Sequence, residues 1–233
     1  MPHYVGAKGP DRDSSLRNLP GWRDDNTMNL MPFCSLGLDC EFGLFQRHVG
    51  SEPIDLLRWA NTPEPALFAM LSDRFARIAD NTILEQLDPV EYMIFNKAYD
   101  IYRHTWISRD KLSDEVVLAR EAQRMAYLAG KLLDELQENS RVFVRSKGTE
   151  DPYLLHAALE KFGGKPTLLF VTDGVAQVDV EVLNPRLIHG KLPKFGETED
   201  LIGTLPVDDW MALCQKVIDL LGLEKSLDIP GGV

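Results

Sequence analysis

A cysteine at the expected start of a helix is the residue of this sequence best placed to do chemistry. The apolar run FCSLGLDC ends at Cys40, and a helix is predicted over residues 40–49. The helix dipole and the unpaired N–H groups of the first turn favour a thiolate there, and the same groups can stabilise an oxyanion. Strand, tight turn, cysteine and helix together predict a nucleophile. The alternative is a buried core residue, because Cys is often buried.

A catalytic cysteine also needs a base, usually a histidine. His104 is the preferred candidate among the five histidines, because it lies in the aromatic, strand-like run YDIYRHTWI. Such surroundings suit a positioned imidazole and equally an ordinary packed one. The other four lie in the N-terminal arm, two turns along the Cys40 helix, on a later helix and near a strand end: His3, His48, His156 and His189.

Charged and aromatic residues follow the cysteine. Asp39 and Glu41 flank it and oppose a thiolate unless both carboxylates point away. Arg47 and Arg58 can each bind an anionic substrate group through paired hydrogen bonds, or can form interior ion pairs that hold a loop. The candidate substrate-binding residues are Glu41, Gln46, Arg47, Glu52, Arg58, Trp59 and Trp106.

The other two cysteines are expected in the core. Cys34 falls inside the strand predicted over 31–37, and Cys214 lies on the apolar stripe of the last helix. Since no close Cys or His pair accompanies Cys34 and Cys40, the spacing does not support a zinc site. No glycine-rich phosphate-binding turn follows a strand. We therefore expect neither a metal nor a cofactor.

The clearest structural pattern is a β-α-β unit. Residues 141–146 (RVFVRS) and 167–173 (TLLFVTD) read as buried strands, and Asp151-Pro152 begins a helix between them. Further strands are expected over 178–183 and 186–192, and a hairpin over 91–95 and 99–107. Three helical segments complete the pattern, namely one or two helices within 54–79, a long helix from Ser113, and a last helix over 206–222. The predicted fold is α/β, with a central mixed, largely parallel sheet covered by helices on both faces.

Length and charge limit the function classes. The chain has 233 residues, with 36 acidic and 25 basic residues and a formal net charge of -11. The acidic excess disfavours nucleic acid and anionic membranes as partners. No signal-peptide core and no run of roughly 18 apolar residues is present, so a cytoplasmic protein is expected. We expect one domain over 29–224, between a polar arm (1–28) and a tail (225–233).

The Cys40 segment resembles a known family. The stretch SLGLDCEFGLFQRHVGSEPIDLLRWA, with His104-Thr105-Trp106 further along, is similar to the DUF1796 family, bacterial proteins described as papain-like cysteine peptidases of unknown function. The matching positions include Ser35-Leu36-Gly37 with Cys40, and Pro53-Ile54-Asp55-Leu56. The resemblance covers roughly residues 30–220.

The resemblance implies a nucleophile, Cys40, and a general base, His104, with Asp55 as the candidate orienting acid. Ile54 and Leu56 replace the aromatic residues of the family's Pro-Phe-Asp-Trp segment. An SGNH-like hydrolase or transferase layout, with Cys40 in place of serine, also fits the strand-turn-helix pattern. The resemblance further implies a link to surface-polysaccharide metabolism.

These observations favour a cysteine-dependent hydrolase or acyl transferase. The first alternative is a non-catalytic binding or accessory protein, in which Cys40, Arg47, Arg58 and His104 form a ligand pocket or a structural core. A nucleotide-sugar transferase ranks third, because the sequence has no Asp-x-Asp motif. The arginines near the recognised segments predict a small polar or anionic substrate. The oligomeric state is left open.

Overall fold

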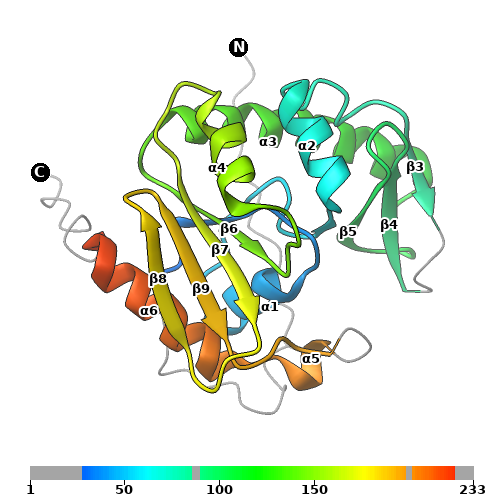
Figure 1. Cartoon of the computed structure of the whole chain (residues 1–233). Helices are drawn as coiled ribbons and strands as arrows, with labels where there is room; N and C mark the ends of the chain where they lie inside the picture. Colours follow the sequence, from blue (N-terminus) through cyan, green and yellow to red (C-terminus); the bar gives the residue numbers. More distant parts are fainter. Residues whose placement is uncertain (1–27, 86–89, 198–200, 224–233) are drawn as a thin grey trace, which may run out of the picture.

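The computed structural model describes residues 28–85, 90–197 and 201–223 (Figure 1). Nearly all of the predicted N-terminal arm, and the whole C-terminal tail, lie outside these ranges. Within them, no helix has both the length and the apolar character needed to cross a bilayer.

A five-stranded sheet forms the centre of the fold. Its order is β1-β6-β7-β9-β8, and every neighbouring pair is parallel except β8 with β9. The strands are β1 (Phe33–Ser35), β6 (Val142–Ser146), β7 (Thr167–Asp173), β8 (Asp179–Asn184) and β9 (Leu187–Leu192). The predicted mixed, largely parallel sheet is confirmed.

A separate antiparallel sheet has the order β2-β5-β4-β3. Its strands are β2 (Ala60–Asn61), β3 (Thr82–Glu85), β4 (Glu91–Asn96) and β5 (Ile101–Ser108). The predicted hairpin corresponds to β4 and β5 and is confirmed. Its place in a second sheet was not predicted. Alternation along a strand shows which residues share a face, but it does not show which sheet the strand joins.

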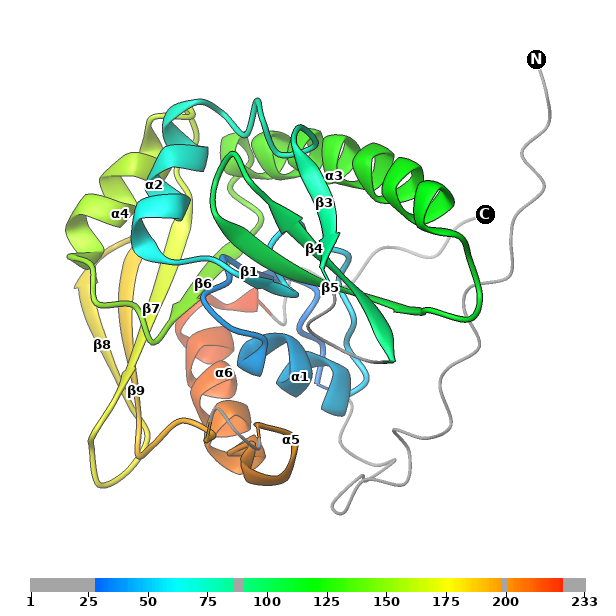
Figure 2. The ribbon, with the colours of Figure 1, turned by 90° about the vertical axis from the view of Figure 1, so that its right-hand side faces the viewer.

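Helices cover both faces of the central sheet, as predicted (Figure 2). They are α1 (Glu41–His48), α2 (Glu64–Ser72), α3 (Asp114–Gln137), α4 (Pro152–Glu160), α5 (Leu201–Thr204) and α6 (Val207–Leu221). Buried residues of α2, α3 and α4 form one core cluster, and those of α1 and α6 form the other. Strand β6 serves both, because Phe143 faces the first cluster while Val142 and Val144 face the second.

The expected start of α4 has a visible cause. Asp151 accepts a hydrogen bond from the backbone N–H of Tyr153 at 2.8 Å and caps α4, and Pro152 occupies the first turn. Within 54–79, α2 is the only helix, and Asp55 and Arg58 are buried in the loop before β2.

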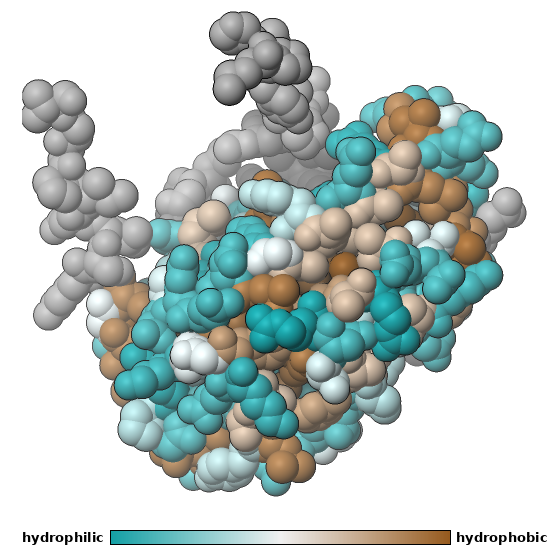
Figure 3. All heavy atoms as spheres, turned by 90° about the horizontal axis from the view of Figure 1, so that it is seen from above, coloured by the Kyte–Doolittle hydropathy of each residue, from teal (hydrophilic) through white to brown (hydrophobic). Residues whose placement is uncertain are grey.

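Figure 3 shows the molecule from above, the side on which α2, α3 and α4 lie in Figure 1. On this face the apolar areas are interrupted by hydrophilic residues.

Candidate active site

Cys40 is the N-cap residue of α1, at the end of the turn that leaves β1. Its carbonyl accepts the N–H of Leu44 at 2.8 Å, and its side chain is partly exposed. The turn contains two residues with positive φ, Gly37 (74°) and Leu38 (101°). A Cβ on Gly37 would lie 2.5 Å from Oγ1 of the buried Thr62, so this position requires glycine. The predicted strand, turn, cysteine and helix are all present.

The side chain of His104 lies beside Cys40, since both residues line one pocket and the cysteine contributes to raising the pKa of the imidazole. On the other side of the ring, His104 Nδ1 contacts Oε1 of Glu91. Since Glu91 occupies Nδ1, the nitrogen available to the Cys40 sulfur is Nε2. The backbone N–H of His104 donates to the carbonyl of Trp59 at 3.0 Å, which fixes this part of β5 against the segment leading to β2. Cys40, His104 and Glu91 thus form a chain of thiol, imidazole and carboxylate.

A bulge in the hairpin positions Glu91. The register shifts between the pairs Met93–His104 and Glu91–Ser108, and Trp106 adopts a positive φ of 58° there. The Trp106 N–H donates to Oε2 of Glu91 at 2.8 Å. One carboxylate oxygen is therefore held by the bulged backbone while the other contacts the imidazole, and bulges commonly re-aim groups in this way.

The environment of His104 favours its charged form. Burial lowers the pKa of the imidazole, but hydrogen bonds to Cys40 and Glu91 and the charges of both groups raise it to about 10. The ring also stacks on Trp106, with the centroids 5.2 Å apart and an angle of 21° between the planes. A histidine held in this way is an imidazolium at neutral pH and is a suitable partner for a thiolate.

Arg47 supports this wall of the site. Its guanidinium lies 4.4 Å from the ring centroid of Trp59 and 4.5 Å from that of Trp106, and its Nε is 3.2 Å from Glu52 Oε2. The two tryptophan rings pack edge to face at 5.0 Å. Arg47 therefore holds the aromatic residues beside His104.

The two acidic residues beside the cysteine share one cationic partner. Lys147 Nζ is 2.6 Å from Asp39 Oδ2 and 2.7 Å from Glu41 Oε2. Glu41 is buried and also accepts from Trp210 Nε1 at 2.8 Å and from the Gly196 N–H at 3.1 Å. Burial raises the pKa of Glu41, and its bonds to Lys147 and Trp210 partly offset this. Glu41 thus ties α1 to α6 and points away from the nucleophile.

A pocket of about 380 Å³ opens beside the cysteine. Its polar lining consists of Asp39, Cys40, Asn61, Tyr102 and His104. Its apolar lining consists of Leu44, Met93, Trp106, Leu201 and Ile202. Of the residues selected from the sequence, the structure brings Cys40, His104 and Trp106 together around this pocket.

The other candidate substrate-binding residues have structural contacts. Gln46 is buried, and its Nε2 donates to the carbonyl of Phe33 at 3.1 Å. Arg58 is 3% exposed and donates to the carbonyls of Pro53 and Gly43 at 3.1 and 2.9 Å. Neither these two residues nor Glu41, Glu52 and Trp59 line the pocket. Arg58 matches the alternative stated for the arginines, an interior contact that holds a loop.

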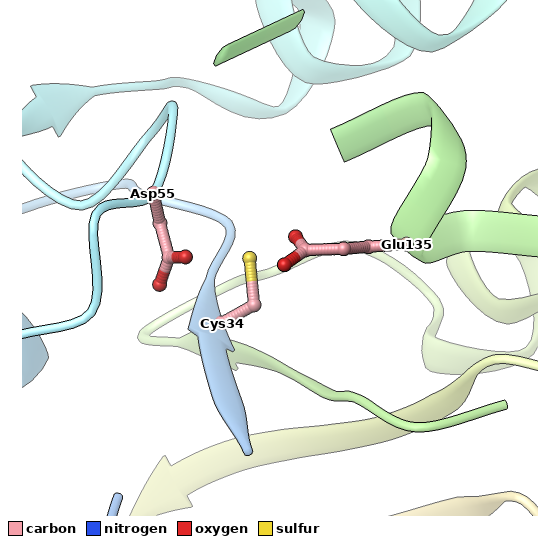
Figure 4. A group of neighbouring side chains, drawn as sticks. All are labelled: Cys34, Asp55 and Glu135. Carbon is pink, nitrogen blue, oxygen red and sulfur yellow. The ribbon is translucent and has the colours of Figure 1, made fainter. Parts of the chain in front are cut away.

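Asp55 lies in a different cluster, so the suggestion that it orients His104 requires correction. Its carboxylate is near Cys34 and Glu135 (Figure 4), and its Oδ1 is 2.7 Å from Arg141 Nη2 and 3.3 Å from Lys131 Nζ. The same two cations lie 3.3 and 3.1 Å from Glu135 Oε1. The carboxylate that contacts the imidazole is instead Glu91.

The cluster around Cys34 has metal-ligating residue types, since its three ligand atoms lie within 4.8 Å of one another. Both carboxylates are nevertheless paired with Lys131 and Arg141, which leaves no net negative charge to attract a cation. Burial raises the pKa of the Cys34 thiol well above its usual range. Cys214 is also buried, and burial raises its pKa. Both cysteines occupy the core, as expected.

Glu91 was missed in the sequence analysis, although the sequence held a signal for it. In the hairpin, His104 pairs with Met93, and Glu91 is two residues away on the same strand. Residues two apart on a strand share a face, so Glu91 is the acidic side chain next to His104 on that face. Leu201 and Ile202 had no comparable signal, because they reach the pocket from about a hundred residues further along the chain.

Comparison with known proteins gave no match to a family model, a curated protein or a solved structure.

Proposed function

We propose that the protein is a cysteine-dependent hydrolase or acyl transferase. The observation that carries the proposal is the chain Cys40–His104–Glu91 at the edge of a pocket. Cys40 is the nucleophile, His104 is the acid and base, and Glu91 orients the imidazole and favours its charged form. These roles match the order of nucleophile and histidine that the resemblance to the DUF1796 family implies.

In the proposed reaction, the Cys40 thiolate attacks a carbonyl carbon, and the electron pair of the carbonyl π bond moves to oxygen. Collapse of this intermediate breaks the bond to the leaving group, which takes a proton from the His104 imidazolium. A water molecule or another acceptor then gives a proton to His104 and attacks the thioester. Cys40 is released as thiolate beside the imidazolium.

The start of α1 is suited to the charge that develops on the carbonyl oxygen. The backbone N–H groups of a first helical turn have no partners within the helix, and Cys40 lies directly before that turn. The Glu41 N–H already donates to Asp39 Oδ1 at 3.0 Å, so the later N–H groups of the turn are the candidate donors. These donors are fixed before the substrate arrives, which is the condition for efficient oxyanion stabilisation.

Iodoacetamide labelling, followed residue by residue with mass spectrometry from pH 5 to 9, tests the proposal. Wild-type Cys40 is expected to react well below pH 8, because the imidazolium maintains a thiolate. In His104→Ala, labelling should require the pH of an ordinary cysteine, about 8.5. The buried Cys34 and Cys214 are internal controls that stay unlabelled in folded protein.

The same experiment separates the proposal from the non-catalytic alternative. Equal pH profiles for Cys40 in wild type and His104→Ala would contradict a thiolate–imidazolium pair. A binding or accessory protein would then be the better interpretation, with Cys40 as one residue of its ligand pocket.

A further inference from the structure

The pocket beside Cys40 is mainly apolar. Leu44 of α1, Met93 of β4 and Leu201 of α5 line it, and these residues come from three separate parts of the chain. Two large apolar side chains on its border are exposed, Trp106 by 42% and Ile202 by 50%. A ligand that covers them gains the free energy of removing apolar surface from water.

The charges around the pocket do not suit an anion. Among the described residues that line it there is no Lys or Arg, and the ionisable groups are Asp39, Cys40, Tyr102 and His104. The nearby Lys147 is paired with Asp39 and Glu41. Among the described lining residues, the one cation is the His104 imidazolium, which already has Glu91 and Cys40 beside it.

The arginines behind the expectation of an anionic substrate lie elsewhere. The guanidinium of Arg47 packs on the rings of Trp59 and Trp106. Arg103 is buried on the opposite face of β5, with Nη1 2.7 Å from Glu121 Oε2. Neither arginine is among the described residues that line the pocket.

We infer that this pocket takes the uncharged, apolar acyl chain of an ester or thioester. The inference rests on the proposed function and specifies its substrate class. A volume of about 380 Å³ is at the lower end of ligand pockets, which suits a chain of medium length. The carbonyl carbon would lie at Cys40, and the chain would extend between Met93 and Ile202.

The covalent step is balanced within the protein and its substrates. Cys40 sulfur forms a bond to the acyl carbon, and the bond from that carbon to the alcohol or thiol breaks. The leaving group departs with its electron pair and the proton of His104. Water then supplies a hydroxyl group to the acid and a proton to His104, so that no oxidant, reductant or cofactor is needed.

The test compares kcat/KM for the p-nitrophenyl esters of acetate, butyrate and hexanoate, together with the anionic mono-p-nitrophenyl ester of succinate. Each methylene that is fully buried should raise kcat/KM by up to about fourfold. We expect a rise of more than about tenfold from acetate to hexanoate, and slower cleavage of the succinate ester than of the butyrate ester. A flat or falling series, or preference for succinate, would overturn the inference.

A matched pair of variants locates the effect. Ile202→Asp places a charge at the pocket border and should lower the hexanoate-to-acetate ratio of kcat/KM by about fivefold or more. Leu220→Asp changes an equally exposed residue on α6, 48% against 50%, and should keep the wild-type ratio. An unchanged ratio in Ile202→Asp would show that the chain binds elsewhere.

A different result would overturn the proposed function itself. If Cys40→Ser cleaves the esters as fast as wild type, Cys40 is not the nucleophile. The pocket is then tested by binding alone, with tryptophan fluorescence of Cys40→Ser reporting titrations of hexanamide and of succinamate. Tighter binding of hexanamide supports an apolar pocket, and equal or reversed affinities overturn it.

Discussion

His104 Nδ1 contacts a carboxylate oxygen of Glu91, a residue on the neighbouring strand of the same hairpin. The second oxygen of that carboxylate accepts the Trp106 N–H at the bulge. The base and the acid that orients it thus belong to one local unit, whereas the cysteine arrives from the end of the central sheet. Assembly of the site depends on how the two sheets meet.

Glu91→Gln should lower the pKa of His104. The wild-type pKa is raised to about 10, against an ordinary value of about 6.5, with hydrogen bonds to Cys40 and Glu91 among the causes. An amide removes the negative charge while keeping the size of the side chain, so the imidazolium loses its proton at lower pH. NMR titration of the His104 ring from pH 5 to 11 measures this shift. The same midpoint in Glu91→Gln and wild type would show that the contact has no electrostatic role.

Lys147→Met should slow alkylation of Cys40 at pH 7. The lysine neutralises Asp39, whose uncompensated charge would disfavour a thiolate at the next residue. One unit charge at 4 Å in water is worth about 1 kcal/mol, which predicts a decrease of about fivefold. Rates are measured with iodoacetamide, and the double variant Lys147→Met/Asp39→Asn should recover most of the loss. If the double variant does not recover, the effect does not come from the charge of Asp39, and the loss of the Lys147 pair with the buried Glu41 is then its source.

Asp55→Ala should destabilise the protein without slowing the chemistry of Cys40. The substitution leaves Arg141 and Lys131 with Glu135 as their remaining partner, and breaking a buried pair costs about 3 kcal/mol or more. Glu181→Ala removes a solvent-screened pair with Lys191 and should destabilise the protein much less than Asp55→Ala does. Urea denaturation measures both changes. Loss of rapid Cys40 labelling in folded Asp55→Ala would return Asp55 to consideration as an orienting acid.

Much of this fold could be predicted, because its elements have local causes. A short local sequence pattern specifies each of three features: the start of α4 at Asp151-Pro152, the apolar strands on either side of it, and the aromatic hairpin. Cys40 and His104, the first selected from its place before a helix and the second from its strand, line the same pocket. Their contact itself depends on how the two sheets pack, which no local pattern specifies.

The charged residues were harder to assign, because the sequence shows their type and not their partners. Arg58 and Asp55 lie in the recognised segment, yet both are buried in contacts that hold the loop before β2. Glu91 lies outside that segment, and its approach to His104 depends on the hairpin register and on the bulge. Which charged side chains contact one another depends on strand register and packing. A shift of one residue in the register moves every side chain of the strand to the opposite face of the sheet.

Gly37→Ala should disturb the nucleophile turn more than Gly50→Ala. Both glycines have φ of 74°, so both substitutions incur the cost of the left-handed region, about 1 kcal/mol. Only at Gly37 does the added Cβ also meet an obstacle, 2.5 Å from Thr62 Oγ1, whereas Gly50 has nothing within 4 Å. Thermal unfolding should therefore show the lower midpoint for Gly37→Ala, and slower iodoacetamide labelling of Cys40 should accompany it, since the turn that carries Cys40 must move. Equal effects at the two positions would mean that the close approach of the turn to β2 does not hold the nucleophile in place.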